Sequence, residues 1–332
     1  MTTPQQPPTE PADQTAGVME VYRPLLLDLF SKQQAALQAL QDSQSVSYEG
    51  PVYHYTGDIG LFEIVRSGTL WVSDYTSMND PSEIQYGIRI GLQLLEAELA
   101  ARNSPVMLRS FVGGFKGRMD NVLEKVLRAF ILSMSIKGDE LTQWRSYGDN
   151  AAGYRLEFDS SILDSAVNQF IAGIPNNGSG SFRVLYDEGD LRSRLSAHVR
   201  NALDVVVTMP RGPMQEMARV FDRIGVDLAL AFIYTSLYYK HSAYESEQEY
   251  RYFIGVRPGQ PPPLLNRARR NKFIDYLSLD WKASFANGLK SIRIGPNGNK
   301  DLAEKFIADI RAKYLAAGMP LVVDQSAIPY RG

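Results

Sequence analysis

Hydrophobic and polar positions follow two periods along this chain, and each period predicts one kind of element. In residues 52–56 they alternate, which is typical of a strand that has His54 on the face opposite its two tyrosines. Residues 58–67 repeat their apolar positions at helical spacing, and Gly68 is a residue type that commonly follows a helix. A second predicted strand, residues 69–73, comes next. Such a unit presents polar and aromatic side chains at strand ends, where small-ligand clefts are commonly built.

The two patterns continue through the chain without a regular alternation of strand and helix. Further helices are predicted at residues 19–41, 81–102, 117–129, 191–207, 214–240 and 301–316. Further strands are predicted at residues 130–135, 153–158, 182–186, 247–254, 291–294 and 321–323. This irregular order favours the α+β class.

One large domain with two additions is the expected organisation. Residues 1–18 are rich in proline, threonine and glutamine and lack the features of a signal peptide, so we expect a disordered tail. Residues 19–48 hold the N-terminal helix, whose apolar stripe packs on the core of the chain itself or on a partner helix. The domain spans residues 49–332 and contains a mostly helical insertion at about 190–240.

Composition and charge exclude several kinds of function. The net charge of −2 and the isoelectric point near 6.0 give no global attraction to nucleic acid or an anionic membrane, but they allow a local basic groove. With no cysteine, disulfides and thiolate catalysis are excluded, and a cytoplasmic location is expected. Three scattered histidines, at 54, 198 and 241, argue against a histidine-rich metal site. No apolar run reaches the roughly 18 residues of a membrane span, so no membrane partner is expected.

Two distant segments hold the candidate chemistry. The first is His54, which is either a structural residue of a half-buried strand or part of a site. In the second, alternation from residue 247 places Glu247, Glu249 and Arg251 on one face of a strand. On a solvated surface, an Arg251–Glu249 pair would contribute only about 0–1 kcal/mol. In a site, Arg251 would orient one carboxylate while the other faces a ligand, and repulsion would separate their pKa values.

Two further segments each have a structural and a functional interpretation. Trp144 and Tyr147 lie three residues apart on one face of a short helix, where they belong to the core or form a stacking wall for a planar ligand. Asp80, Pro81 and Glu83 suit the N-cap, first turn and capping box of the helix that follows, which requires no function.

These segments together resemble a bacterial family catalogued as domain of unknown function 2971. Its specific motifs are Asn-Asp-Pro-x-Glu at residues 79–83 and Glu-x-Glu-x-Arg at residues 247–251. The resemblance extends from about Tyr53 to Arg331 and also covers His54-Tyr55-Thr56, Trp71-Val72-Ser73, 133–135, 144–147, Gly153-Tyr154, Lys240, 294–296 and 326–331. That family is in turn similar to the ADP-ribosyltransferases, which include bacterial toxins that modify DNA. The resemblance implies an ADP-ribosyltransferase-like core with a split mixed sheet.

The resemblance also implies NAD as substrate and assigns roles to residues. His54 would contact the nicotinamide-side ribose, and Thr56 or the nearby backbone would seat the nicotinamide amide. Glu247 or Glu249 would be the catalytic glutamate. The other expected NAD-binding residues are Tyr55, Tyr75, Asn79, Trp144, Tyr147 and Arg251. The spacing does not choose the stacking aromatic among them, and the role of Asn79-Asp80 stays open.

The expected chemistry needs carboxylates and no metal. Breaking the nicotinamide–ribose bond builds positive charge on the ribose, which a fixed carboxylate in a dry cleft stabilises. A second carboxylate can accept the proton of the incoming nucleophile. The implied function is an NAD-dependent ADP-ribosyltransferase, or an NAD glycohydrolase if water is the acceptor. A bacterial toxin or phage-defence effector, with an antitoxin or defence partner, fits that function, and the acceptor is DNA, RNA or protein.

Two other functions are compatible with the same residues. Asp80, Glu83, Glu247 and Glu249 could form the oxygen-ligand site of a metal-dependent nuclease or phosphohydrolase. The chain could also be an inactive module that binds a nucleotide or a protein in its pocket. Sensitivity to EDTA would favour the first, and affinity without turnover would favour the second.

Overall fold

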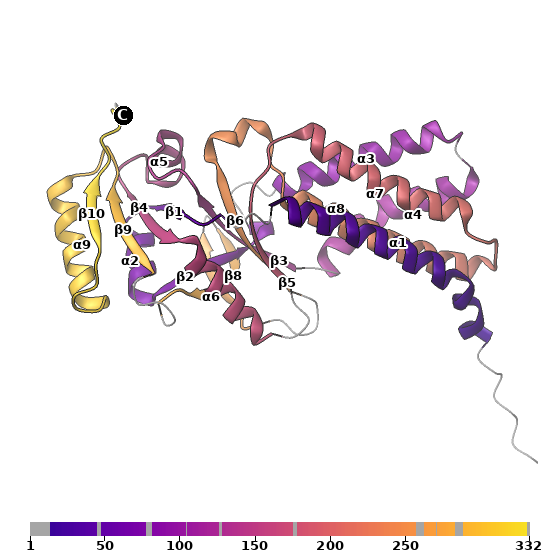
Figure 1. The fold of residues 1–332 in the computed structure, drawn as a ribbon, viewed down its shortest axis with the longest axis horizontal. Helices are drawn as coiled ribbons and strands as arrows, with labels where there is room; N and C mark the ends of the chain where they lie inside the picture. The colour runs from indigo at the N-terminus through magenta and orange to yellow at the C-terminus, as the bar shows by residue number, and fades with distance from the viewer. Residues whose placement is uncertain are drawn as a thin grey trace, which may run out of the picture.

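A mixed β-sheet and a bundle of helices lie side by side along the long axis of the molecule (Figure 1). The computed structural model describes residues 14–44, 48–77, 82–103, 105–125, 128–174, 178–256, 262–269, 271–282 and 288–330. Within these ranges the α+β class predicted from the sequence is confirmed. No helix in the described ranges combines the length and the apolar character that crossing a membrane requires.

The described strands form one ten-stranded sheet in which only β9 and β10 run parallel to each other. The strands are β1 Pro51–Thr56, β2 Thr69–Asp74, β3 Arg128–Ser135, β4 Tyr154–Asp159, β5 Gly178–Arg183, β6 Glu249–Val256, β7 Leu265–Arg269, β8 Lys272–Asp280, β9 Leu289–Ile294 and β10 Val322–Gln325. The strand predicted at residues 182–186 lies earlier in the chain, at residues 178–183, because the glycine- and serine-rich residues 178–181 pair with β6. Pairing supplied by a neighbouring strand outweighs the low strand propensity of these residues.

The sheet forks at β3, and the fork creates the space for a site. Strand β1 pairs with β3 only through Tyr53 and Ser135, and β2 pairs with β3 only at Ser73 and Asp74. Strand β6, in contrast, pairs with β3 along its whole length. The sheet therefore divides into a β1 wing (β1, β4, β9, β10) and a β2 wing (β2, β8, β7), and β3 lies at the base of the opening between them.

The helices divide between the two halves of the molecule. They are α1 Gln14–Gln44, α2 Asp58–Ser67, α3 Ser82–Ala101, α4 Val106–Lys125, α5 Leu141–Tyr147, α6 Ser160–Ala172, α7 Glu188–Thr208, α8 Met214–Leu237 and α9 Lys300–Tyr314, with short 3₁₀ helices η1 Tyr75–Ser77 and η2 Ser242–Glu247. Helices α2, α6 and α9 bury their apolar residues with the sheet. Helices α1, α3, α4, α7 and α8 enclose a second apolar core, to which β3, β5 and β6 also contribute residues (Figure 1).

The predicted helical insertion is thus one part of a larger bundle. Helices α7 and α8 correspond to the expected residues 190–240, but they share their core with α1, α3 and α4. The N-terminal helix packs on this core through Tyr22, Leu29 and Leu40, so the expectation of an intramolecular contact is confirmed.

Two helix boundaries differ from the predictions. Helix α1 begins at Gln14, so residues 14–18 of the predicted tail are helical, and the rest of that tail lies outside the described residues. Helix α4 begins at Val106 and not at residue 117, although glycines interrupt its helical pattern. Phe111 and Phe115 are buried in the bundle, and this tertiary packing outweighs the low helix propensity of glycine.

A buried polar contact joins α1 to the rest of the bundle. The Nδ1 atom of His198 on α7 contacts the Oε1 atom of Gln33 on α1, and its Nε2 atom lies 3.3 Å from the hydroxyl oxygen of Thr235 on α8. Burial, together with the nearby charge of Arg194, lowers the pKa of His198 to about 4. His198 is therefore a neutral structural histidine.

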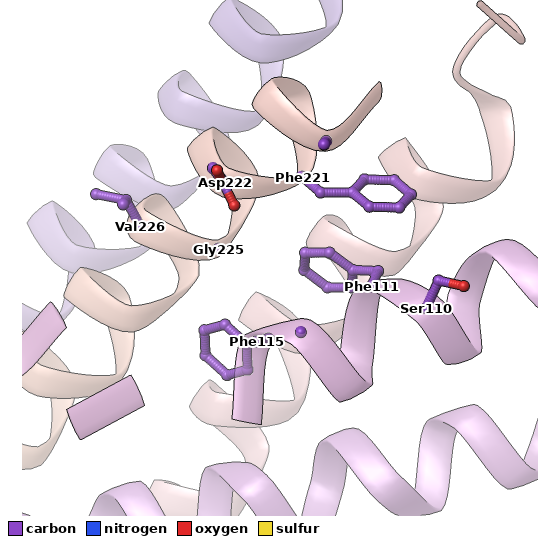
Figure 2. Close-up of a pocket in the computed structure, with 9 residues that line it drawn as sticks. Ser110, Phe111, Phe115, Phe221, Asp222, Gly225 and Val226 are labelled. Atoms are coloured by element: carbon purple, nitrogen blue, oxygen red, sulfur yellow. The ribbon is translucent and has the colours of Figure 1, made fainter. Parts of the chain in front are cut away.

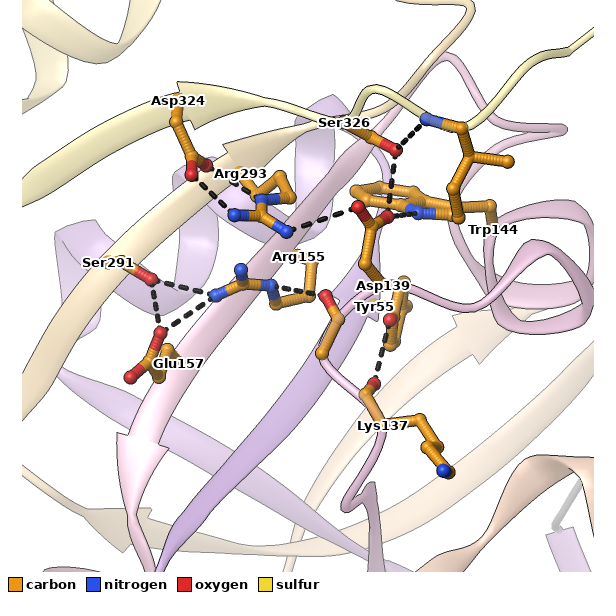
Figure 3. A network of polar contacts seen from close by, with 12 residues as sticks. Tyr55, Lys137, Asp139, Trp144, Arg155, Glu157, Ser291, Arg293, Asp324 and Ser326 are labelled. Carbon is orange, nitrogen blue, oxygen red and sulfur yellow. Dashed lines mark hydrogen bonds and ion pairs between the residues drawn. The ribbon is translucent and has the colours of Figure 1, made fainter.

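At the opposite end of the molecule, a polar network attaches the C-terminal strand to the sheet (Figure 3). Arg293 of β9 donates from Nε to Asp324 of β10 at 2.8 Å and from Nη1 to Asp139 at 3.1 Å. The other oxygen of Asp139 accepts 2.7 Å hydrogen bonds from the Trp144 indole and from the Ser326 hydroxyl. Helix α5 is thereby connected to the C-terminal segment.

A close backbone approach beside β1 gives a test of this fold. A Cβ atom at Gly153 would lie 2.3 Å from the carbonyl oxygen of Thr56 and 2.9 Å from that of Gly148. Because rigid backbone must move, we expect Gly153→Ala to lower the free energy of unfolding by about 1–3 kcal/mol. Gly113→Ala in α4, where nothing lies within 4 Å, should instead be neutral or stabilising by up to about 1 kcal/mol. Urea unfolding of both variants measures the difference, and equal stabilities would contradict the packing described.

Candidate functional site

A cleft of about 1000 Å³ lies where the two wings of the sheet separate. Strands β1, β2 and β3 line it, together with the start of α2, helix α5 and the segment from Lys240 to Glu249. Charged, polar and aromatic side chains from distant parts of the chain therefore share one concave surface, as ligand sites commonly do.

The cleft brings together most of the residues singled out in the sequence. The members that line it are His54, Tyr55, Thr56, Tyr147, Glu247 and Glu249. Tyr55 exposes little surface, because its ring packs edge-on against Trp144 and its hydroxyl donates a 2.8 Å hydrogen bond to the carbonyl of Lys137. Tyr147 is consequently the predicted aromatic best placed to contact a ligand.

Three of the predicted ligand contacts lie outside the cleft lining. Trp144 is fully buried, and its indole nitrogen is bonded to Asp139 (Figure 3). Tyr75 packs against the helical core, and Arg251 is fully buried behind Glu249. None of the three lines the cleft. Asn79 and Asp80 lie outside the described residues, as does the side chain of Glu83.

One lysine holds the two glutamates of the cleft. The Lys240 ammonium nitrogen lies 2.6 Å from Oε2 of Glu247 and 3.3 Å from Oε2 of Glu249. The side chains of all three residues are less than a tenth exposed. Charges this deeply buried require close partners, because the interior solvates them poorly.

The glutamates reach this lysine by a route that strand alternation did not predict. Strand β6 begins at Glu249, whereas Glu247 is the last residue of the 3₁₀ helix η2. Between them Gln248 adopts a left-handed conformation with φ of 44°. This turn brings both carboxylates to the same ammonium group, although only one of them belongs to the strand.

Glu249 is held more tightly than Glu247. Arg251 donates to both of its carboxylate oxygens, at 2.6 and 3.1 Å. Burial alone would raise the pKa of Glu249, but the charges of Arg251 and Lys240 outweigh it and keep that pKa well below its usual range. The interpretation of an exposed surface pair is therefore wrong, since the Arg251–Glu249 pair is buried.

Glu247 is fixed by neutral donors as well as by Lys240. Its carbonyl oxygen accepts hydrogen bonds from the Ser135 hydroxyl at 2.8 Å and the Gln143 amide at 3.1 Å. Its carboxylate accepts a 3.0 Å hydrogen bond from the Tyr147 hydroxyl. With 9% of its side chain exposed, against 4% for Glu249, Glu247 is the more accessible carboxylate.

His54 carries no charge at neutral pH. Burial and the positive charge of Arg267 lower its pKa to about 4, although a hydrogen bond with the Ser133 backbone acts in the opposite direction. A neutral imidazole can donate one hydrogen bond and accept another, so His54 can bind a hydroxyl group without adding charge to the cleft.

Several polar, charged and aromatic lining residues were not assigned a role from the sequence. Lys240 and Gln143 contact Glu247, and Trp71 and Arg267 form the β2-wing side of the cleft. The alternation of residues 69–73 placed Trp71 and Ser73 on one face, a signal that could have identified Trp71. Arg267 lies in a stretch for which no strand was predicted, so no pattern pointed to it.

A second hollow lies in the helical bundle, between α4 and α8 (Figure 2). Its volume is about 380 Å³, and most of its wall is apolar, with rings from Phe111, Phe115 and Phe221. It has one charged lining residue, Asp222. This composition offers no set of converging polar groups for catalysis, so the sheet cleft is the better candidate.

The lysine between the glutamates gives a first test of the site. Lys240→Met leaves two buried carboxylates with one fewer counter-charge, and we expect the free energy of unfolding to fall by about 3–5 kcal/mol at pH 7. The loss should shrink at acidic pH, where a carboxylate can become neutral by binding a proton. Lys137→Met, at an exposed position, should change stability by less than about 0.5 kcal/mol. Equal stability of Lys240→Met and wild type would contradict the buried network.

The neutral state of His54 gives a second test. Below about pH 6.5 the unfolded chain binds a proton at His54 that the folded chain does not bind until about pH 4. Its contribution to stability is therefore complete above pH 6.5 and is lost as the pH falls through this window. We expect His54→Asn to reduce the slope of unfolding free energy against pH by up to about 1.4 kcal/mol per pH unit. Urea unfolding between pH 7 and pH 4 measures the slope, and an unchanged slope would show that His54 is protonated in the folded state.

Comparison with known proteins supports the family resemblance over part of the chain. The family described as protein of unknown function (DUF2971) matches residues 143–252, a range that includes Tyr147, Lys240, Glu247 and Glu249. No curated protein and no solved structure matches the chain. The matched region, which is less than half of the chain, thus holds the carboxylate side of the cleft.

Proposed function

We propose that this chain is an NAD-dependent ADP-ribosyltransferase, or an NAD glycohydrolase where water is the acceptor, and that the sheet cleft is its active site. The observation that supports the proposal is the convergence of His54 from the first strand with Glu247 from a distant segment in one cleft. The same surface includes Trp71 and Tyr147, whose rings can border a planar leaving group.

In this proposal Glu247 is the catalytic carboxylate. Cleavage of the nicotinamide–ribose bond generates an oxocarbenium-like ribose, and a fixed negative charge beside it lowers the barrier. The Lys240 ammonium contacts one oxygen of the Glu247 carboxylate, while the Tyr147 hydroxyl orients the other. Glu249 serves as a buried counter-ion that positions Lys240, since Arg251 already engages both of its oxygens.

His54 and the aromatic residues are assigned to substrate binding. The neutral imidazole suits a ribose hydroxyl, which needs a donor or an acceptor and no charge. Tyr147 is the predicted aromatic that remains as a contact for nicotinamide, and Trp71 is added to it as a second candidate. Thr56 retains its proposed role beside the nicotinamide amide, because it lines the cleft next to His54.

A metal-dependent nuclease or phosphohydrolase is the less favoured alternative. Its proposed ligands include Glu247 and Glu249, but the Lys240 ammonium lies between their carboxylates. A divalent cation there would meet a like charge at short range, which is unfavourable at a buried position. Among the described residues, no group of three or more potential ligands clusters around a common point.

One substitution distinguishes an active enzyme from an inactive binding module. We expect Glu247→Gln, which removes the charge and keeps the shape, to lower nicotinamide release from NAD by about 10²–10³-fold. NAD affinity should change by less than about threefold, because the substitution acts on charge that develops during bond cleavage. Nicotinamide release followed by chromatography and NAD binding followed by calorimetry provide the two measurements, both in the presence of EDTA.

Glu245→Gln is the matched control, since Glu245 lies on the same 3₁₀ helix but is exposed. It should retain wild-type turnover. Binding of NAD without turnover by the wild-type protein would favour the binding module. Turnover that survives unchanged in Glu247→Gln would remove Glu247 from the mechanism.

A further inference from the structure

The β7–β8 hairpin forms the outer edge of the β2 wing and has a composition unlike that of the whole chain. Residues 265–274 contain four basic residues, Arg267, Arg269, Arg270 and Lys272, and no acidic residue, although the chain carries a net charge of −2. Strand β7 is the last strand on this side of the sheet, so the hairpin ends a continuous surface. Lys272 is exposed.

The strand register places Arg267 and Lys272 on the face that lines the cleft. Arg267 pairs with Ile274, and Lys272 is two residues from Ile274, so Arg267 and Lys272 belong to one face of the hairpin. Directly paired residues share a face, and Tyr276 of β8 pairs with Ser73 of β2, which lines the cleft. On the opposite face, Val72, Leu277 and Leu279 belong to the sheet core, whereas Phe273 near the end of the hairpin is exposed.

Aromatic rings connect the basic hairpin with the cleft. The guanidinium carbon of Arg267 lies 4.6 Å from the centre of the Trp71 ring, and an Arg267 nitrogen donates to the Ser73 hydroxyl at 3.3 Å. The ring of Tyr276 lies 4.9 Å from that of Trp71 at an angle of 36°. Trp71, Arg267 and Tyr276 are each partly exposed. A strip of cations and aromatic rings thus extends from the cleft to the edge of the sheet, and we call it the hairpin track (Trp71, Arg267, Tyr276 and Lys272).

We propose that the hairpin track binds single-stranded nucleic acid and leads one of its nucleotides to the cleft. Cations spaced along the protein surface can contact successive phosphates of a nucleic acid, and aromatic rings between them can stack on its bases. This combination is typical of surfaces that bind single-stranded nucleic acid. A duplex hides its base faces, so the rings favour a single strand. An acidic protein segment would use the cations but would leave the paired aromatic rings without a function.

This inference rests on the proposed function only for the chemistry that follows binding. In that chemistry the C1 atom of the ribose loses its bond to nicotinamide and forms a bond to a nitrogen or oxygen of the nucleotide. Nicotinamide leaves as a neutral molecule, and the proton of the nucleophile passes to solvent. Binding by the hairpin track itself requires neither NAD nor turnover.

The test measures binding of a fluorescein-labelled 20-nucleotide single strand, as DNA and as RNA, by fluorescence anisotropy over a series of salt concentrations. We expect Lys272→Glu to weaken binding about tenfold at low salt and to reduce the slope of log K against log salt by about one. Lys290→Glu makes the same charge change at an exposed position of β9 on the other wing, and it should change affinity by less than about twofold. Equal losses in the two variants would overturn the hairpin track.

Competition and turnover measurements complete the experiment. Unlabelled single strand should displace the probe at a lower concentration than the same sequence as a duplex or a poly-glutamate peptide. If the peptide displaces the probe at an equal or lower concentration than the single strand, the partner is an acidic protein and not a nucleic acid. If the wild-type chain releases nicotinamide from NAD but does not bind the single strand, this inference fails and the proposed function stands. If Lys272→Glu selectively loses binding and no preparation consumes NAD, the hairpin track stands and the proposed function fails.

Discussion

The candidate site depends on the Lys240 ammonium group, which lies between two buried carboxylates. Glu247 and Glu249 enter the interior of the protein only because Lys240 and Arg251 accompany them. Two negative and two positive side chains make the cluster neutral, so no uncompensated charge is buried. The cluster also ties the end of α8, through the neighbouring Lys240, to the start of β6. The same contacts that stabilise this part of the fold thus fix the accessible carboxylate of the cleft.

The forked sheet determines what this cluster faces. Strand β6 occupies one edge of β3 along its whole length, so β1 and β2 share the other edge and leave residues 132–134 of β3 between their short pairings. The few pairs that join these strands to β3 allow the two wings to separate. His54 and Glu247 then line the same cleft from two distant segments of the chain. Helices α3, α4 and α7 contribute none of their described residues to the lining of this opening.

Local pattern predicted the elements of this fold better than it predicted the orientation of individual side chains. Alternation identified β1, and it placed His54 and Glu247 in separate segments that the structure unites in the cleft. Alternation gave the wrong strand start near Gln248, because a pattern with a period of two cannot indicate that this residue adopts a left-handed backbone conformation. It also could not show that Trp144 is turned inward, because the partner that holds it, Asp139, is itself held by residues near the C-terminus. Arg267 was missed because its neighbours are basic and polar and give no hydrophobic period.

The attachment of the C-terminal segment has a mechanical consequence for the cleft. Ser326 and Arg293 both hold Asp139, and Asp139 holds Trp144 on the short helix α5, which also carries Tyr147 (Figure 3). A pull on the last residues is therefore transmitted through three side chains to the wall of the cleft. The position of Tyr147 is thus coupled to residues that lie some 180 positions later in the chain, through contacts that involve no atom of the cleft itself.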